Sequence, residues 1–103
     1  MIIKNALKKI EEIVRDLKNE EINDRLLSYS TIVTILSRID EAIKDQKFPN
    51  YTLYKQDLLQ GCEVLCGLDD NNGIDDAQYI GGALAAVRKM GSYSCFNVDN
   101  HYI

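Results

Sequence analysis

Apolar residues recur every three or four positions in the first part of the chain. Ile3, Leu7, Ile10, Val14 and Leu17 follow this spacing, with lysines, glutamates and other polar residues between them. In an α-helix this spacing places the apolar side chains on one face and the charged side chains on the other. The pattern therefore predicts an amphipathic helix over residues 3–17 that buries one face.

A second stripe with the same period is predicted to form another helix. Its apolar positions are Ile22, Leu26, Tyr29, Val33, Leu36, Ile39 and Ile43. The β-branched stretch over residues 31–35 would also suit a strand, but the helical period continues on both sides of it, so we expect a helix. Ser28 and Ser30 are candidates for a kink or a fresh N-cap within it.

A third helix is predicted after the only proline, Pro49. Proline disfavours the α conformation in the residue before it, and Asn50 or Thr52 can cap the helix that follows. This helix should run to Cys66, and Gly67 suits the left-handed position just after a helix end. Its inward face is predicted to hold Tyr54, Leu58, Leu59, Cys62, Leu65 and Cys66.

A fourth helix is predicted after the polar loop LDDNNGID, with Asp75 as its N-cap and Gly91 at its end. Its inward residues should be Ile80, Leu84, Val87 and Met90. Gly81 and Gly82 weaken helix propensity, which is tolerated where another backbone approaches closely. We interpret these two glycines as the site of a tight helix crossing.

These four segments predict an all-α fold, a single domain over residues 1–103 built as a bundle of about four helices with an irregular C-terminal tail. The last twelve residues, SYSCFNVDNHYI, lack a helical period. A chain of 103 residues with 46% hydrophobic content can bury its own core. We expect that core to hold Leu7, Ile10, Val14, Leu36, Ile39, Leu58, Leu65, Leu84 and Val87.

The overall charge and composition narrow the classes of function. The formal net charge is −4, which argues against a nucleic-acid partner and against an anionic membrane surface, because both are bound through cationic side chains.

No apolar run is long enough to span a membrane, and the N-terminus lacks the apolar region of a signal peptide. Three cysteines cannot close a complete disulfide framework. We therefore expect a cytoplasmic protein.

The excess negative charge is concentrated in one segment. Between Lys55 and Arg88 the chain runs for 32 residues with no lysine or arginine. This segment carries six carboxylates: Asp57, Glu63, Asp69, Asp70, Asp75 and Asp76. A local negative field of this kind attracts a basic partner or a cation.

A calcium site in the acidic loop is not supported by its register. With Gly73 at the sixth position of an EF-hand loop, Leu68 falls at position one and Tyr79 at position twelve, where carboxylates are needed. A polar interhelix loop is the better interpretation, with at most a weak adventitious cation site.

A zinc site is also disfavoured. Cys62 and Cys66 are four residues apart, and Cys95 with His101 would complete a tetrahedral set. The first two cysteines fall on the predicted core stripe, where a free cysteine behaves as a small hydrophobic residue. Cys95 and His101, the only histidine, have no group to orient them for nucleophilic catalysis. We expect no metal, no cofactor and no enzymatic activity.

Tyrosines flank the acidic segment and suggest an interface. Tyr51, Tyr54 and Tyr79 lie beside its carboxylates, and tyrosine is a common rigid anchor in protein interfaces. The alternative is that Tyr54 belongs to the core and the other two cover helix ends. The candidate partner-binding residues are Tyr51, Tyr54, Asp57, Asp69, Asp70, Asp75, Asp76 and Tyr79.

In size, acidity and helical content the chain resembles the small bacterial immunity proteins that neutralise nuclease toxins of the colicin and contact-dependent growth inhibition types. The acidic tract with its tyrosines, YTLYKQDLLQGCEVLCGLDDNNGIDDAQY, carries the resemblance. It implies that an acidic surface docks on the basic cleft of a nuclease and occludes it.

Two other functions stay open. One is a phage-encoded inhibitor of a host nuclease, such as an anti-CRISPR protein, which would use the same acidic mimicry. The other is a helical oligomeric adaptor whose seam is the apolar stripe over residues 3–17.

Overall fold

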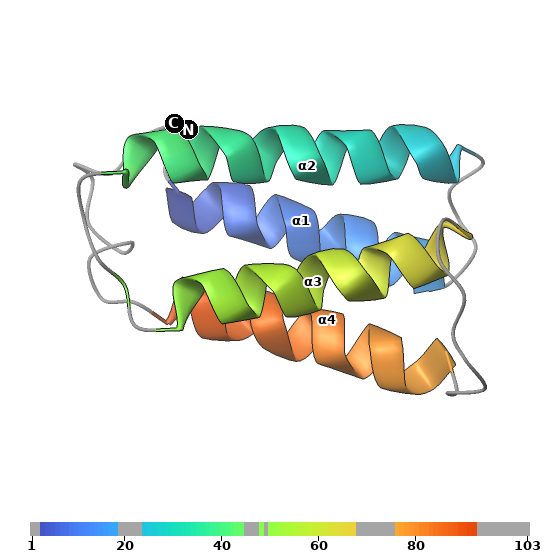
Figure 1. Cartoon of the computed structure of the whole chain (residues 1–103). Coiled ribbons are helices and arrows are strands. Elements are labelled where there is room, and N and C mark those ends of the chain that lie inside the picture. Colours follow the sequence, from blue (N-terminus) through green and yellow to red (C-terminus); the bar gives the residue numbers. More distant parts are fainter. Residues whose placement is uncertain (1–2, 19–23, 45–47, 49, 68–75, 93–103) are drawn as a thin grey trace.

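Four α-helices make up the protein in a computed structural model that describes residues 3–18, 24–44, 48, 50–67 and 76–92 (Figure 1). They are α1 (Ile3–Lys18), α2 (Arg25–Ala42), α3 (Tyr51–Leu65) and α4 (Asp76–Gly91). Consecutive helices run in opposite directions, and no strand occurs in the described ranges. The predicted all-α bundle is confirmed, whereas the C-terminal tail from residue 93 lies outside the described residues.

The apolar face of α1 forms the centre of the core. Ile3, Ala6, Ile10 and Val14 are fully buried, as the helical spacing predicted. Burying such side chains contributes about 1.5–3 kcal/mol each for the larger ones. Because this stripe is covered by the other helices of the same chain, it is not free to form the oligomeric seam that the adaptor hypothesis assigned to it.

The buried face of α2 differs from the predicted one. Leu26 is 60% exposed and Val33 is 36% exposed, while Ile32 is fully buried. The buried residues within the helix are Ser28, Ile32, Leu36 and Ile39. Apolar residues occupy more than one side of this helix, so its spacing fits two registers. The packed register turns Ile32 inward and leaves Leu26 and Val33 at the surface.

The helix α2 is continuous, without the kink or fresh cap considered at Ser28 and Ser30. Its N-cap is Asp24, whose Oδ1 accepts a hydrogen bond from the backbone N–H of Leu27 at 2.9 Å. The Ser28 hydroxyl donates to the Asp24 carbonyl oxygen at 3.1 Å, which satisfies the one buried polar side chain of the described core.

The helices α3 and α4 form the most extensive helix pair, and Gly61 allows their close approach. A Cβ atom at residue 61 would lie 2.7 Å from the carbonyl oxygen of Tyr79 and 2.8 Å from the Cβ of Ala83. By contrast, a Cβ at Gly81 or Gly82 would meet nothing within 4 Å. The tight crossing therefore exists, but its assignment to Gly81 and Gly82 is wrong, because both face away from the neighbouring helices.

The ends of α3 match the sequence prediction in part. Gly67 has a φ of +73°, and its N–H donates to the Val64 carbonyl oxygen, so the predicted left-handed residue after the helix is confirmed. At the start, Asn50 is the N-cap residue, but with a left-handed φ of 63° and without a side-chain hydrogen bond.

Candidate partner-binding surface

The structure does not bring the described members of the predicted partner-binding set together in one place. Tyr51 and Tyr54 lie in the first turn of α3, whereas the loop LDDNNGID follows the other end of this helix, which ends at Leu65. Fourteen helical steps separate Tyr51 from Leu65, a distance of about 21 Å along the helix axis. These two tyrosines therefore do not flank the acidic loop in space.

Tyr51 is part of a polar link between α2 and α3. Its side chain is only 8% exposed, and its hydroxyl donates to Asp40 Oδ1 at 2.8 Å. The other oxygen, Oδ2, lies 2.8 Å from the ammonium group of Lys55. One carboxylate of α2 thus holds two side chains that are one turn apart on α3, and the Tyr51 ring packs near Phe48 with centroids 6.4 Å apart.

Tyr54 and Asp57 lie along α3, away from its C-terminal end. The Tyr54 ring is half-buried and lies 5.5 Å from the ammonium nitrogen of Lys89 on α4, at cation–π distance. Asp57 is exposed. Both side chains belong to the helical body of the protein rather than to the acidic loop.

Tyr79 lies one turn into α4, close to the acidic loop. Asp76 is the first residue of this helix, so its backbone lies at the end of the bundle where the loop returns. Tyr79 is half-buried, and its carbonyl oxygen faces Gly61. The remaining predicted residues, Asp69, Asp70 and Asp75, lie outside the described residues.

The beginning of α2 meets the end of α3 at this same end of the bundle. The Arg25 guanidinium donates to the carbonyl oxygen of Leu65, and the Cys66 thiol donates to the Arg25 carbonyl oxygen at 3.2 Å. One turn further in, the Tyr29 hydroxyl donates to Glu63 Oε1 at 2.9 Å. The antiparallel order of the helices therefore brings the connection from α1 to α2 and the connection from α3 to α4 to one end.

This arrangement adds acidic residues that the sequence analysis did not group with the loop. The stretch from α1 to α2 contains Glu20 and Glu21, followed by Asp24 at the α2 N-cap. In the sequence these residues are more than 40 positions from Asp69. The signal that could have found them is the helix count, since in an antiparallel bundle alternate connections share an end.

The charge of the described helical body differs in sign from that of the whole chain. The ranges that the structure describes hold eleven of the twelve lysines and arginines but only nine of the sixteen aspartates and glutamates. The excess negative charge therefore resides in the connections and the tail, and two of those connections leave one end of the bundle.

Cys62 and Cys66 belong to the packing of this region. Cys62 is fully buried, and burial, with smaller contributions from Cys66 and Glu63, raises the pKa of its thiol to about 12. Burial also raises the pKa of Cys66, opposed by the charge of Arg25, and raises that of Tyr29 to about 12, aided by Glu63. All three groups are neutral at pH 7. No cluster of three or more His, Cys, Asp or Glu residues within the described part of the chain is placed to hold a metal ion.

No protein-family model, no curated protein sequence and no solved structure matches this chain. Among the helices described above, none combines the length and the apolar character that a membrane span requires.

Proposed function

We propose that this protein is a small inhibitor that binds a basic protein partner, in the manner of a bacterial immunity protein against a nuclease toxin. The acidic end of the bundle docks on the cationic cleft that such a nuclease uses for its substrate, and so blocks it. A phage-encoded inhibitor of a host nuclease would use the same surface, and the genes beside this one distinguish these two origins.

One observation carries the proposal: the antiparallel fold gathers two acidic connections at one end of a helical body that is not itself acidic. Such a concentrated field steers a cationic partner and speeds its association. If the same charges were spread evenly over the surface, they would favour solubility more than recognition. The proposed surface consists of Glu20, Glu21, Asp24, Asp69, Asp70, Asp75, Asp76 and Tyr79.

Three residues of the candidate set, Tyr51, Tyr54 and Asp57, are not part of the proposed surface. Tyr51 is buried against Asp40, Tyr54 packs beneath Lys89, and Asp57 lies on α3 between the two ends. Tyr79 remains a candidate anchor because it is half-buried and lies one turn from Asp76.

Co-expression with the protein encoded next to this one tests the proposal directly. If the neighbour is a toxin, the wild-type protein should rescue growth. The double variants D69K/D70K and E20K/E21K should each lower protection, because each reverses two charges on the same end. Binding kinetics on the purified pair should show slower association and a weaker dependence on salt for both variants.

A matched control reverses the same number of charges elsewhere. Glu12 on α1 and Glu41 on α2 are exposed, so E12K/E41K changes the net charge equally without touching the acidic end. This control should protect fully. Full protection by D69K/D70K and E20K/E21K, with all three variants folded by circular dichroism, would rule out the proposed surface.

A helical adaptor is the second candidate, supported by the outer face of α2. Leu26 and Leu27 are 60% and 62% exposed, and the stretch from Leu26 to Ser37 contains no charged residue. An uncharged helical face with exposed leucines suits contact with another protein surface. Sedimentation of the purified protein, with L26E/L27E as the disrupting variant, distinguishes an oligomer from a monomer.

A further inference from the structure

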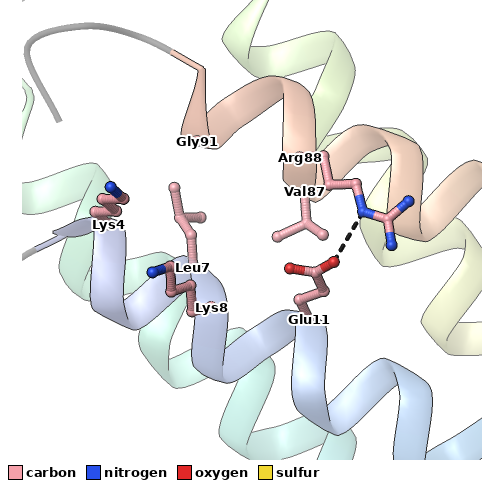
Figure 2. A pocket seen from close by; sticks show the side chains of 7 residues that line it. All are labelled: Lys4, Leu7, Lys8, Glu11, Val87, Arg88 and Gly91. Atoms are coloured by element: carbon pink, nitrogen blue, oxygen red, sulfur yellow. Dashed lines mark hydrogen bonds and ion pairs between the residues drawn. The ribbon is translucent and has the colours of Figure 1, made fainter. Parts of the chain in front are cut away.

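A groove with a volume of about 190 Å³ lies between the first half of α1 and the last turn of α4 (Figure 2). Lys4 and Lys8 line it from α1, and Arg88 lines it from α4. Leu7 and Val87 form its floor and are almost fully buried. The groove thus combines an apolar base with three cationic side chains at its rim.

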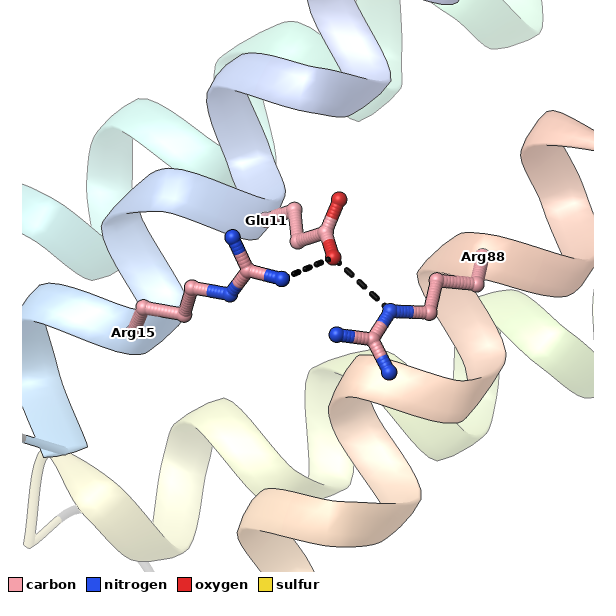
Figure 3. Close-up of polar contacts among 3 residues, drawn as sticks. All are labelled: Glu11, Arg15 and Arg88. Atoms are coloured by element: carbon pink, nitrogen blue, oxygen red, sulfur yellow. Dashed lines mark hydrogen bonds and ion pairs between the residues drawn. The ribbon is translucent and has the colours of Figure 1, made fainter.

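Glu11 is the only carboxylate among the described residues that line the groove, and two arginines already neutralise it. Glu11 Oε1 accepts from Arg15 Nη2 at 2.9 Å and from Arg88 Nε at 2.8 Å, so one oxygen bridges two arginines (Figure 3). This bridge joins α1 to α4 and leaves the potential of the groove positive. In a chain with a net charge of −4, such a site is a local feature rather than a reflection of the overall charge.

Lys4 and Lys8 differ from the described lysines and arginines that form ion pairs, which are Arg15, Lys44, Lys55 and Arg88. Lys44 and Lys55 have ion-pair partners at 2.9 and 2.8 Å, but within the described ranges no carboxylate lies at ion-pair distance from Lys4 or Lys8. The two are one turn apart on α1, where like charges repel. Lys4 also lies in the first turn of that helix, where the helix dipole disfavours a cation. An anion between them would relieve both effects.

We propose that this groove binds a small organic phosphate, with Lys4 and Lys8 holding the phosphate and the apolar floor receiving the organic part. A phosphate monoester carries a charge of about −1.5 to −2 at pH 7, which matches two ammonium groups better than a single carboxylate does. Lysine binds phosphate as a point charge. An apolar cavity of about 150 Å³ accommodates benzene, so a ring-sized group fits the space above Leu7 and Val87. The site is independent of the proposed inhibitory surface.

Calorimetric titration of the full chain with phenyl phosphate and with inorganic phosphate, at constant ionic strength, tests this proposal. Both should bind saturably, and phenyl phosphate should bind more tightly because it also contacts the floor. The K4A/K8A variant should bind at least about tenfold more weakly, since two charge-assisted hydrogen bonds are lost. The E11Q variant should bind more tightly, because it removes the negative charge from the groove.

The control is K9A/K44A, which removes two exposed lysines outside the groove and should bind like the wild type. Absence of saturable binding by the wild type would overturn the proposal, as would equal affinities of K4A/K8A and K9A/K44A. Equal affinities of the wild type for the two phosphates would overturn the role of the apolar floor. If K4A/K8A melts at a lower temperature but binds both phosphates like the wild type, the lysines stabilise the C-terminal end of α4 instead. That result would also overturn the proposal.

Discussion

At the scale of single residues, Gly61 shows how one missing side chain fixes a helix crossing. The space that a Cβ would need is occupied by the Tyr79 carbonyl oxygen and the Ala83 Cβ. Neither is the end of a flexible side chain, so neither can move without shifting α4. The identity of residue 61 therefore sets the distance between α3 and α4.

The variants G61A and G82A should have opposite effects on stability. Alanine at residue 82 should stabilise the protein by about 0.5–1 kcal/mol, because it raises helix propensity in open space. Alanine at residue 61 gains the same propensity but overpacks the crossing, so we expect a net loss of about 1–3 kcal/mol. Urea denaturation of both variants checks this, and stabilisation by G61A would contradict the described contact.

Cys62 should make stability fall at alkaline pH. Its pKa is raised from 9.0 to about 12 in the folded protein, so the folded state holds the proton more tightly than the unfolded state. The resulting stabilisation is complete below pH 9 and is lost as pH rises toward 12. Within that window the free energy of unfolding should fall by up to about 1.4 kcal/mol per pH unit more in the wild type than in C62A. Parallel pH profiles of the two proteins would show that the thiol is not buried.

At the scale of elements, the limits of α2 and α3 depend on how the backbone groups at their ends are hydrogen-bonded. The start of α2 relies on the Asp24 side chain, which accepts from the Leu27 N–H at 2.9 Å. The end of α3 relies on the left-handed Gly67. Both ends lie beside the acidic connections, so the residues that stop and start these helices also fix where those connections leave the bundle.

Removing the α2 cap should weaken the protein by a modest, measurable amount. D24A should lower the free energy of unfolding by about 1 kcal/mol, because an orphan backbone N–H loses its acceptor. D24N retains an acceptor oxygen without the charge and should remain close to the wild type. Chemical denaturation of both variants separates the cap from the charge, and equal losses in the two would assign the effect to the charge.

The sequence predicted the number and the approximate limits of the helices, because turn residues and helical spacing are local signals. It did not predict the buried face of α2, since Leu26, Ile32 and Val33 offer two apolar registers and only packing selects one. It also did not identify the crossing residue. Gly61, Gly81 and Gly82 all occur inside helices, and whether another backbone lies opposite each of them is a property of the assembled bundle.

The sequence predicted that the candidate surface is acidic, but it did not predict which residues lie near one another on it. The acidic loop was visible as a run without lysine or arginine, but the nearby tyrosines were grouped with it by sequence distance alone. A helix of fifteen residues is a rigid rod, so Tyr51 lies at the opposite end from the loop that follows Leu65. The contribution of Glu20 and Glu21 comes from helix order, which no local pattern contains.

At the scale of the whole molecule, the four helices are unequally joined. The α3–α4 pair shares the most extensive contact, and α1 packs mainly on α4. The α2 helix packs less extensively on its neighbours and leaves Leu26 and Leu27 at the surface. Its attachment relies in part on polar links, such as those from Asp40 to Tyr51 and Lys55.

Native-state hydrogen exchange should therefore give different opening free energies for α2 and for the α3–α4 pair. Amides in the middle of α2 should exchange through openings of lower free energy than amides in α3 and α4, because fewer apolar contacts must separate. Exchange measured over a range of low denaturant concentrations gives these free energies residue by residue. Identical opening energies in all four helices would mean that the bundle unfolds only as one unit.

The contact between Gly61 and α4 also has an evolutionary consequence. In any relative that keeps this crossing, the side chains of residues 61 and 83 compete for the same space. A larger residue at 61 could not be accommodated by a smaller residue at 83 alone, because the Tyr79 carbonyl oxygen would still be in the way. Glycine at 61 and a small residue at 83, 22 positions apart, should thus persist in descendants whose surfaces have diverged beyond recognition. We therefore expect this pair to vary less among relatives than the acidic loop does.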